Sequence, residues 1–219
     1  MEKDFKESEL YQAPLGAERE GGYGIYILLA LLFFLALFFR VWWTSNYGGV
    51  VVDGSSMYKT LISGEKLLMR YVDDVEDLER GDVIVVYVGN YEECSSIKDG
   101  YLIKRLIAIE GDKVKCTDGQ IFICYAGTSE YVPLEEPYAY YTNSSSYDFQ
   151  GQEYEVGEGE IFFLGDNRNN SCDSRYKEYN GSHLKGQLYK ATDVYGVVPE
   201  WAIEHSDVLE KIFFGNNTK

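Results

Sequence analysis

Basic residues are scarce in this chain, which has 20 lysines and arginines against 36 aspartates and glutamates and a formal net charge of −16. Proteins that bind nucleic acids need basic surfaces to neutralise the phosphates, so this balance argues against a nucleic-acid partner. The composition also excludes a disordered acidic chain, because 45% of the residues are hydrophobic and 16% are aromatic. The 219 residues are enough to bury a real hydrophobic core.

Histidine and cysteine, the usual ligands of structural zinc, are also rare. The two histidines, His183 and His205, are isolated in the sequence, and no Cys-x-x-Cys pair is present. The sequence therefore predicts no metal site, and we expect no cofactor. An even number of cysteines permits disulfides outside the cytosol, in any of three pairings, and the four are Cys94, Cys116, Cys124 and Cys172.

Two of these cysteines flank Asp118–Gly119 in the stretch VKCTDGQIFIC, which is typical of a β-hairpin with a two-residue loop. A symmetric loop of this kind would place Cys116 opposite Ile121. A bridge from Cys116 to Cys124 would then need a distorted hairpin. The pairing of the cysteines stays open at this stage.

A negative mean hydropathy of −0.27 hides one long apolar segment. Residues 23–39 carry no charge, and Val41, Trp42 and Trp43 follow the single Arg40. Counted through Trp43, the segment can cross a hydrocarbon core of roughly 30 Å. A buried core helix should show a polar stripe, and a cleavable signal has an apolar run of only about 7–15 residues. We therefore predict a retained membrane anchor at residues 23–43, in contact with lipid.

The orientation of this anchor follows from the basic residues beside it. The tail, residues 1–22, contains Lys3, Lys6 and Arg19, whereas only Arg40 lies close to the other side. Because positive residues stay on the cytoplasmic side, we expect a cytoplasmic tail and an exported domain at residues 44–219.

The exported part is predicted to be a mainly β, antiparallel domain. Short β-type runs alternate with turn sequences, and no helix-length segments separate them. Residues 113–159 are predicted to form an inserted subregion, a β-hairpin followed by an irregular stretch over 128–151. The predicted strands cover residues 49–52, 66–72, 82–88, 101–109, 113–116, 120–125, 153–156, 160–164 and 194–198.

The first segment with chemical potential is Val50–Leu61, where an apolar extended stretch runs into Gly54-Ser55-Ser56. A serine at such a junction can be exposed on a turn, close to backbone N–H groups that could bind an oxyanion. The alternative is an ordinary surface loop, because Gly-Ser-Ser is common in loops.

The second segment is Tyr101–Ile109. On a strand, Lys104 would share a face with Leu102, Leu106 and Ala108. Desolvation on an apolar face lowers the pKa of a lysine and lets the neutral amine act as a general base. The alternative is an edge strand from which Lys104 reaches water.

The third segment, Gly165–Arg175, combines turn-forming residues with two arginines, two aspartates and two serines. Such a loop can be held by its own hydrogen bonds and can fix an Asp–Arg pair. The alternatives are a solvated loop and a calcium loop. The arginines, and the absence of a glutamate at ligand spacing, make calcium a poor fit.

In chain order these segments resemble the sequence boxes of bacterial type I signal peptidases. The matching stretches are Gly-Ser-Ser-Met-x-x-Thr-Leu, Arg-Gly-Asp-Val-Ile-Val-Val, Leu-Ile-Lys-Arg-Leu-Ile-x-x-x-Gly-Asp-Lys-Val and Gly-Asp-Asn-Arg-x-x-Ser-x-Asp-Ser-Arg. They span roughly residues 40–200 and follow an apolar anchor, as in that family. The resemblance implies an antiparallel β catalytic domain with one N-terminal transmembrane helix.

The resemblance also implies a serine–lysine dyad, with Ser56 as the nucleophile and Lys104 as the general base. Supporting roles would fall to Gly54 near the oxyanion, Ser171 orienting the Lys104 amine, an Asp173–Arg175 ion pair, and Asp166 and Asn167 structuring the loop. The extended substrate would lie along Val52, Asp53, Met57, Leu102 and Ile103.

Two positions depart from the pattern of the family. Lys59 replaces a usual proline three residues after the nucleophile. Gly54 stands where many members place a hydroxyl that donates to the oxyanion, so the oxyanion would depend mainly on backbone N–H groups, notably that of Ser56. On this basis, a serine at position 54 is expected to keep or raise turnover.

The resemblance therefore implies an endopeptidase that removes signal peptides from secretory preproteins after small residues, at Ala-x-Ala sites. It would act at the extracellular face of the cytoplasmic membrane. One alternative is a non-catalytic, single-pass surface β-domain that binds partners. Another is a serine–lysine peptidase dedicated to a narrow client.

Overall fold

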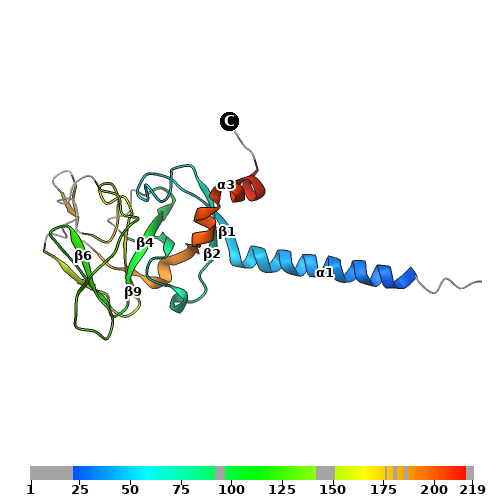
Figure 1. Ribbon diagram of the computed structural model, residues 1–219, viewed down its shortest axis with the longest axis horizontal. Coiled ribbons are helices and arrows are strands. Elements are labelled where there is room, and N and C mark those ends of the chain that lie inside the picture. The colour runs from blue at the N-terminus through cyan, green and yellow to red at the C-terminus, as the bar shows by residue number, and fades with distance from the viewer. Residues whose placement is uncertain are drawn as a thin grey trace, which may run out of the picture. The chain divides into compact units, whose positions relative to one another are not determined.

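The computed structural model describes residues 22–91, 97–141, 151–175, 177–179, 182–184 and 187–215 (Figure 1). The chain divides into two compact units, Met1–Trp43 and Thr44–Lys219. Helix α1, Gly22–Asn46, is long and apolar enough to cross a membrane, and none of its most apolar window is buried. It continues three residues past the predicted end of the anchor. The predicted tail lies, apart from Gly22, outside the described residues.

The larger sheet has seven strands, and each of its strand pairs is antiparallel, as the sequence predicts. The strands follow the order β1-β2-β13-β3-β4-β9-β12 across the sheet. Their bounds are Tyr47–Val51 for β1, Lys66–Tyr71 for β2, Val194–Val198 for β13, Val83–Tyr87 for β3, Tyr101–Ile109 for β4, Glu160–Leu164 for β9 and Tyr189–Lys190 for β12.

A second sheet lies in the inserted subregion, with the predicted hairpin as its two central strands. It has four strands in the order β7-β6-β5-β8. Strand β8 lies within the strand predicted over 153–156, whereas β7 was not predicted, because it is only two residues long and contains a proline. The bounds are Val132–Pro133 for β7, Gln120–Cys124 for β6, Lys113–Thr117 for β5 and Glu153–Glu155 for β8.

Short elements complete the described fold. A separate hairpin pairs β10, Lys177–Tyr179, with β11, Ser182–Leu184. After β13 the chain forms α2, Glu200–Glu204, α3, Ser206–Leu209, and the π-helical turn η6, Glu210–Phe214. Single 3-10 turns are η1, Val75–Asp77, η3, Lys98–Gly100, and η5, Ala191–Asp193.

The hairpin between β5 and β6 has the predicted two-residue loop. Asp118 and Gly119 have φ angles of 52° and 79°, and Cys116 lies opposite Ile121, which confirms the expected register. Cys124 lies opposite Lys113 instead, so the hairpin does not bring the two cysteines together. The Cys124 thiol is free and lies 3.5 Å from the carbonyl oxygen of Thr128. Cys94 lies outside the described residues.

Strand β9 separates two hydrophobic cores. Ile161 and Phe163 pack into one core, and Phe162 and Leu164 pack into the other, which includes the second sheet. Burying one such side chain contributes about 1.5–3 kcal/mol. A bulge in the neighbouring strand β4 interrupts its alternation between Leu106 and Ala108.

The bulge corrects one prediction about β4. Leu102 and Leu106 belong to the first core, but Ala108 belongs to the second. The extra residue at the bulge shifts the alternation by one, so Ala108 does not share the apolar face predicted for Lys104.

Candidate active site

Ser56 lies in a turn between β1 and β2 that is held in place by buried side chains. Its neighbours Met57 and Leu61 are each 1% exposed, and the Leu61 N–H donates to the Met57 carbonyl at 2.8 Å. Ser56 itself is half-buried. Gly54, with φ of +94°, begins the turn and donates its N–H to Ser63 Oγ at 3.2 Å. These contacts therefore fix the backbone of the turn that carries the Ser56 hydroxyl.

Lys104 meets this serine from the middle of the large sheet. Strand β4 lies between β3 and β9, and Lys104 is only 1% exposed, so its side chain does not reach water as the edge-strand alternative requires. The Lys104 Nζ atom donates to Ser56 Oγ at 2.7 Å and to the Ile103 carbonyl at 2.8 Å. At that distance, a neutral amine could instead accept the hydroxyl proton.

The loop after β9 is held by a buried ion pair. Arg105, the residue after the lysine, donates from Nε and Nη2 to the two Asp166 carboxylate oxygens at 2.8 and 2.6 Å. Asp166 is fully buried and also accepts from the Thr60 hydroxyl at 2.5 Å. Asp166 thus ties the loop to β4 and to the turn that carries Ser56.

A second ion pair closes the far end of the same loop. Arg175 donates from Nε and Nη2 to Asp173 at 2.9 and 2.8 Å, and both side chains are buried. The Asp173 carboxylate also accepts from the Gly165 N–H at 3.2 Å. The pair predicted between Asp173 and Arg175 is therefore present in the structure.

Asn167 connects this loop to the backbone of the nucleophile. Its N–H donates to the Ser56 carbonyl and its Nδ2 to the Ser55 carbonyl, each at 2.9 Å. Asn170 Nδ2 adds a bond to Ser55 Oγ at 3.0 Å. The loop thus holds the two peptide groups beside the Ser56 hydroxyl.

Sequence reasoning missed a neighbouring segment. Residues 134–141, here called the bridging segment, pack against the loop. Glu136 forms an ion pair with Arg168, Tyr138 stacks on the Arg105 guanidinium at 4.0 Å, and Tyr140 hydrogen-bonds across the loop. This segment lies in the stretch predicted to be irregular, and it has no periodic pattern that could have revealed these contacts.

The charges in this cluster shift two pKa values. Burial, followed by the charge of Glu136, raises the pKa of the Tyr138 hydroxyl above its ordinary value. Burial disfavours the charged Arg168, but the hydrogen bonds and the charge of Glu136 outweigh it and raise the pKa of the guanidinium. Both side chains therefore keep their protons at neutral pH.

Comparison with known proteins identifies the family of this chain. The family profile described as "Signal peptidase, peptidase S26" matches residues 24–203. Signal peptidase I U and signal peptidase I T, both from Bacillus subtilis strain 168, are 33% and 34% identical to this chain. These alignments cover 69% and 70% of this chain, and 73% and 74% of those proteins. This chain belongs to the S26 signal peptidase family.

A crystal structure of a signal peptidase I from Enterococcus faecalis V583 covers 57% of this chain and 100% of its own, with a TM-score of 0.38 and 24% identity. As a member of the S26 signal peptidase family, the chain is a serine endopeptidase that processes signal peptides. The non-catalytic surface protein considered above is therefore not favoured.

The family resemblance predicts that Ser171 orients the Lys104 amine. The structure buries Ser171 beside Gly165, where an added Cβ would lie 2.6 Å from the Ser56 carbonyl and would overlap the Ser171 hydroxyl. Within the described part of the chain, however, Ser171 Oγ has no hydrogen-bond partner. Ser171 is thus close to the nucleophile without a bond to Lys104, and its role stays a prediction.

The residues predicted to bind the substrate of this signal peptidase differ in their exposure and in their free backbone hydrogen-bonding groups. The backbone N–H and carbonyl of Val52 already bond to Glu65 and Gly64, at 2.9 and 2.8 Å, and its role in binding the substrate stays a prediction. The side chains of Val52 and Met57 are buried, at 5% and 1% exposure, whereas Asp53 is exposed.

Strand β4 offers an open edge instead. Its pairing with β9 begins at Arg105, and in the described part of the chain no strand covers the same edge of Leu102 and Ile103. A peptide could therefore add to β4 directly beside the Lys104–Ser56 contact.

The structure also explains the two departures from the family pattern. The turn at Lys59 is held by aromatic contacts, because Lys59 Nζ lies 5.0 Å from the Tyr140 ring and Tyr58 packs edge-on against the same ring. At Gly54, the φ of +94° is a conformation that residues with a side chain rarely adopt. The expectation that serine would be tolerated there therefore needs correction.

Proposed function

We propose that this peptidase cleaves signal peptides with Ser56 as the nucleophile and Lys104 as the general base. The observation that carries the proposal is the 2.7 Å contact between Lys104 Nζ and Ser56 Oγ, with the lysine 1% exposed. Because burial disfavours the ammonium form, the amine can be neutral and take the hydroxyl proton.

The proposed reaction follows from these two groups. Ser56 Oγ bonds to the scissile carbonyl carbon while its proton moves to Lys104, and the carbonyl oxygen becomes an oxyanion that the Ser56 N–H stabilises. Lys104 then gives the proton to the leaving amine as the C–N bond breaks. Water, deprotonated by Lys104, releases the acyl group and restores the Ser56 hydroxyl.

The substrate is proposed to be a secretory preprotein, bound as an extended strand along the open edge of β4 at Leu102 and Ile103. The small residues of an Ala-x-Ala site would let the substrate backbone approach this edge closely, next to Ser56. Asp53 and Met57 border the same turn.

The proposed setting is the cytoplasmic membrane, with residues 1–22 inside, residues 23–43 as the anchor and residues 44–219 on the extracellular face. Anchoring enzyme and preprotein in one membrane raises their effective concentration. Protease added outside intact cells should then digest the domain, and full protection of the domain would contradict this orientation.

The test is to incubate the detergent-solubilised protein with a panel of preproteins and to identify the products by mass. Cleavage after Ala-x-Ala, lost when either alanine is replaced by a large residue, is the expected result. Cleavage of a single preprotein would indicate a narrow client instead. No cleavage of any preprotein would contradict the proposal.

A further inference from the structure

The bridging segment, residues 134–141, links the second sheet to the loop that holds the nucleophile. We propose that this segment, through the ion pair of Glu136 with Arg168, positions the backbone N–H of Ser56 that stabilises the oxyanion. The inference rests on the proposed function, because it assigns a role only if Ser56 is the nucleophile. Glu136, Tyr140 and Asn167 would then be positioning residues that act through the Ser56 peptide group.

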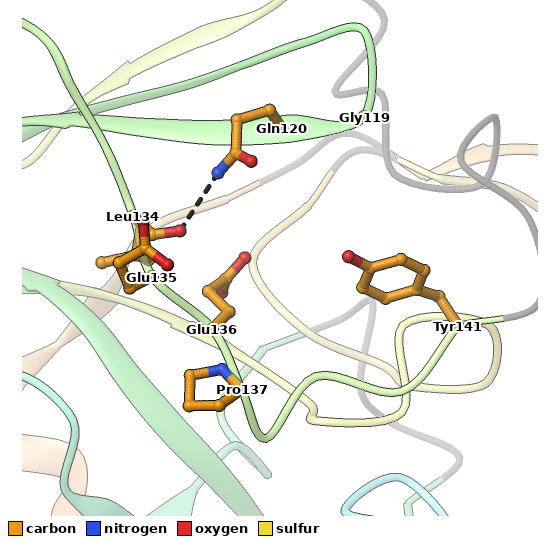
Figure 2. A pocket seen from close by; sticks show the side chains of 7 residues that line it. All are labelled: Gly119, Gln120, Leu134, Glu135, Glu136, Pro137 and Tyr141. Atoms are coloured by element: carbon orange, nitrogen blue, oxygen red, sulfur yellow. Dashed lines mark hydrogen bonds between the residues drawn. The ribbon is translucent and has the colours of Figure 1, made fainter.

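One end of the segment is tethered to strand β6. The Leu134 N–H donates to the Ile121 carbonyl at 2.9 Å, and Gln120 Nε2 donates to the Leu134 carbonyl at 3.0 Å. Figure 2 shows the latter bond at the border of a pocket of about 350 Å³. The segment therefore starts from a paired strand of the second sheet.

The other end of the segment clamps the loop around Asn167. The Tyr140 N–H donates to the Asp166 carbonyl at 2.7 Å, and the Arg168 N–H donates to the Tyr140 carbonyl at 2.9 Å. These two bonds lie on either side of Asn167 in the chain. Tyr140 thus pairs with this short stretch as a strand would.

The ion pair between Glu136 and Arg168 fixes the bridging segment against the loop. Arg168 is 2% exposed, donates from Nη1 to Glu136 at 3.0 Å, contacts the same carboxylate through Nη2, and donates from Nε to the Gly165 carbonyl at 3.0 Å. One guanidinium therefore joins the bridging segment to the start of the loop. A buried, bidentate pair of this kind has little freedom to shift.

The bridging segment and the loop act on the oxyanion site through one planar peptide group, which joins Ser55 to Ser56. Asn167 Nδ2 holds the Ser55 carbonyl at 2.9 Å. In a trans peptide, this carbonyl and the Ser56 N–H belong to one plane and point in opposite directions. Fixing the Ser55 carbonyl therefore fixes the direction of the Ser56 N–H. This direction matters here because Gly54 offers no hydroxyl to share the charge.

The test is steady-state kinetics of two variants in the full-length, detergent-solubilised enzyme. Glu136→Gln should lower kcat about tenfold, and Asn167→Ala about a hundredfold, both with KM nearly unchanged, because only the transition state carries the oxyanion. The matched controls are Glu130→Gln and Asn90→Ala, which alter exposed side chains outside the bridging segment and the loop and should match the wild type.

A peptide aldehyde separates positioning from a general loss of structure. Ser56 Oγ adds to the aldehyde carbon, the hydroxyl proton moves to Lys104, and the former carbonyl oxygen carries the negative charge. Affinity for the aldehyde should fall in parallel with kcat, while affinity for the corresponding peptide alcohol, which forms no adduct, should not change. Equal losses for both ligands would mean a merely structural role and would overturn the proposal.

Two further outcomes are informative. A kcat within twofold of the wild type in Asn167→Ala, or in Glu136→Gln, would overturn the positioning role. The variant Ser56→Ala distinguishes this failure from that of the proposed function. If Ser56→Ala is inactive while Glu136→Gln is fully active, only the positioning role fails. If Ser56→Ala cleaves at the wild-type rate, both proposals fail.

Discussion

The ion pair between Arg105 and Asp166 should dominate the stability of the loop around the candidate active site. Asp166 is fully buried and accepts three hydrogen bonds, two from Arg105 and one from Thr60, while the Arg105 side chain is 12% exposed. In Asp166→Asn, one acceptor becomes an NH₂ group that faces other donors. Arg105 is then left as a buried charge without a counter-charge.

Removing one partner of a buried pair destabilises a protein by about 3–5 kcal/mol. For a chain of this size, each kcal/mol lowers the melting temperature by roughly 2–4 °C. We therefore expect Asp166→Asn to melt roughly 6–20 °C below the wild type, as measured by circular dichroism in detergent.

The matched control is Glu155→Gln, which breaks the exposed pair of Lys113 and Glu155, with a separation of 3.1 Å and side-chain exposures of 39% and 71%. Such a pair contributes about 0–1 kcal/mol, so the control should melt close to the wild type. The double variant Arg105→Met/Asp166→Leu should recover much of the loss, because it leaves no buried charge. A melting temperature of Asp166→Asn equal to that of the control would refute the reasoning.

Two further predictions concern turnover. Gly54→Ser and Gly54→Ala should both lower kcat and thermal stability, because a side chain at φ of +94° costs about 1–2 kcal/mol. A serine variant that is faster than the wild type would show instead that an added hydroxyl outweighs the backbone strain. The pH profile of kcat/KM should rise through a group whose pKa lies below the ordinary lysine value of about 10.4, because burial of Lys104 disfavours its ammonium form. Activity is then present above this pKa and lost as the pH falls through it, and a rise that begins only at the ordinary value would contradict the buried base.

The sequence predicted the strand that carries Lys104 and its neighbour β9 because their signals are local. Strand β4 has the predicted bounds, and β9 reads as an apolar run because both of its faces are buried. The motif order also pointed to Ser56 and Lys104 before any distance was known. Such features depend on neighbouring residues and on alternation, which a sequence displays directly.

Features that depend on distant pairing were missed. The pair of Glu136 and Arg168 joins residues 32 positions apart, and neither residue belongs to a periodic pattern. The bulge in β4 is a single extra residue, so the sequence still alternates in appearance while the face of Ala108 changes. Gly54 looked replaceable because the sequence does not show that the folded turn imposes a positive φ at this position.

The central claim is that Ser56 and Lys104 form one catalytic unit. The most direct measurement compares cleavage of one preprotein by the wild type, Ser56→Ala and Lys104→Met, at equal concentrations of protein whose fold is verified by circular dichroism. Members of one catalytic unit fail together, so both variants and the double variant should lose at least about 10³-fold in kcat/KM. A rate within tenfold of the wild type in either single variant would contradict the account.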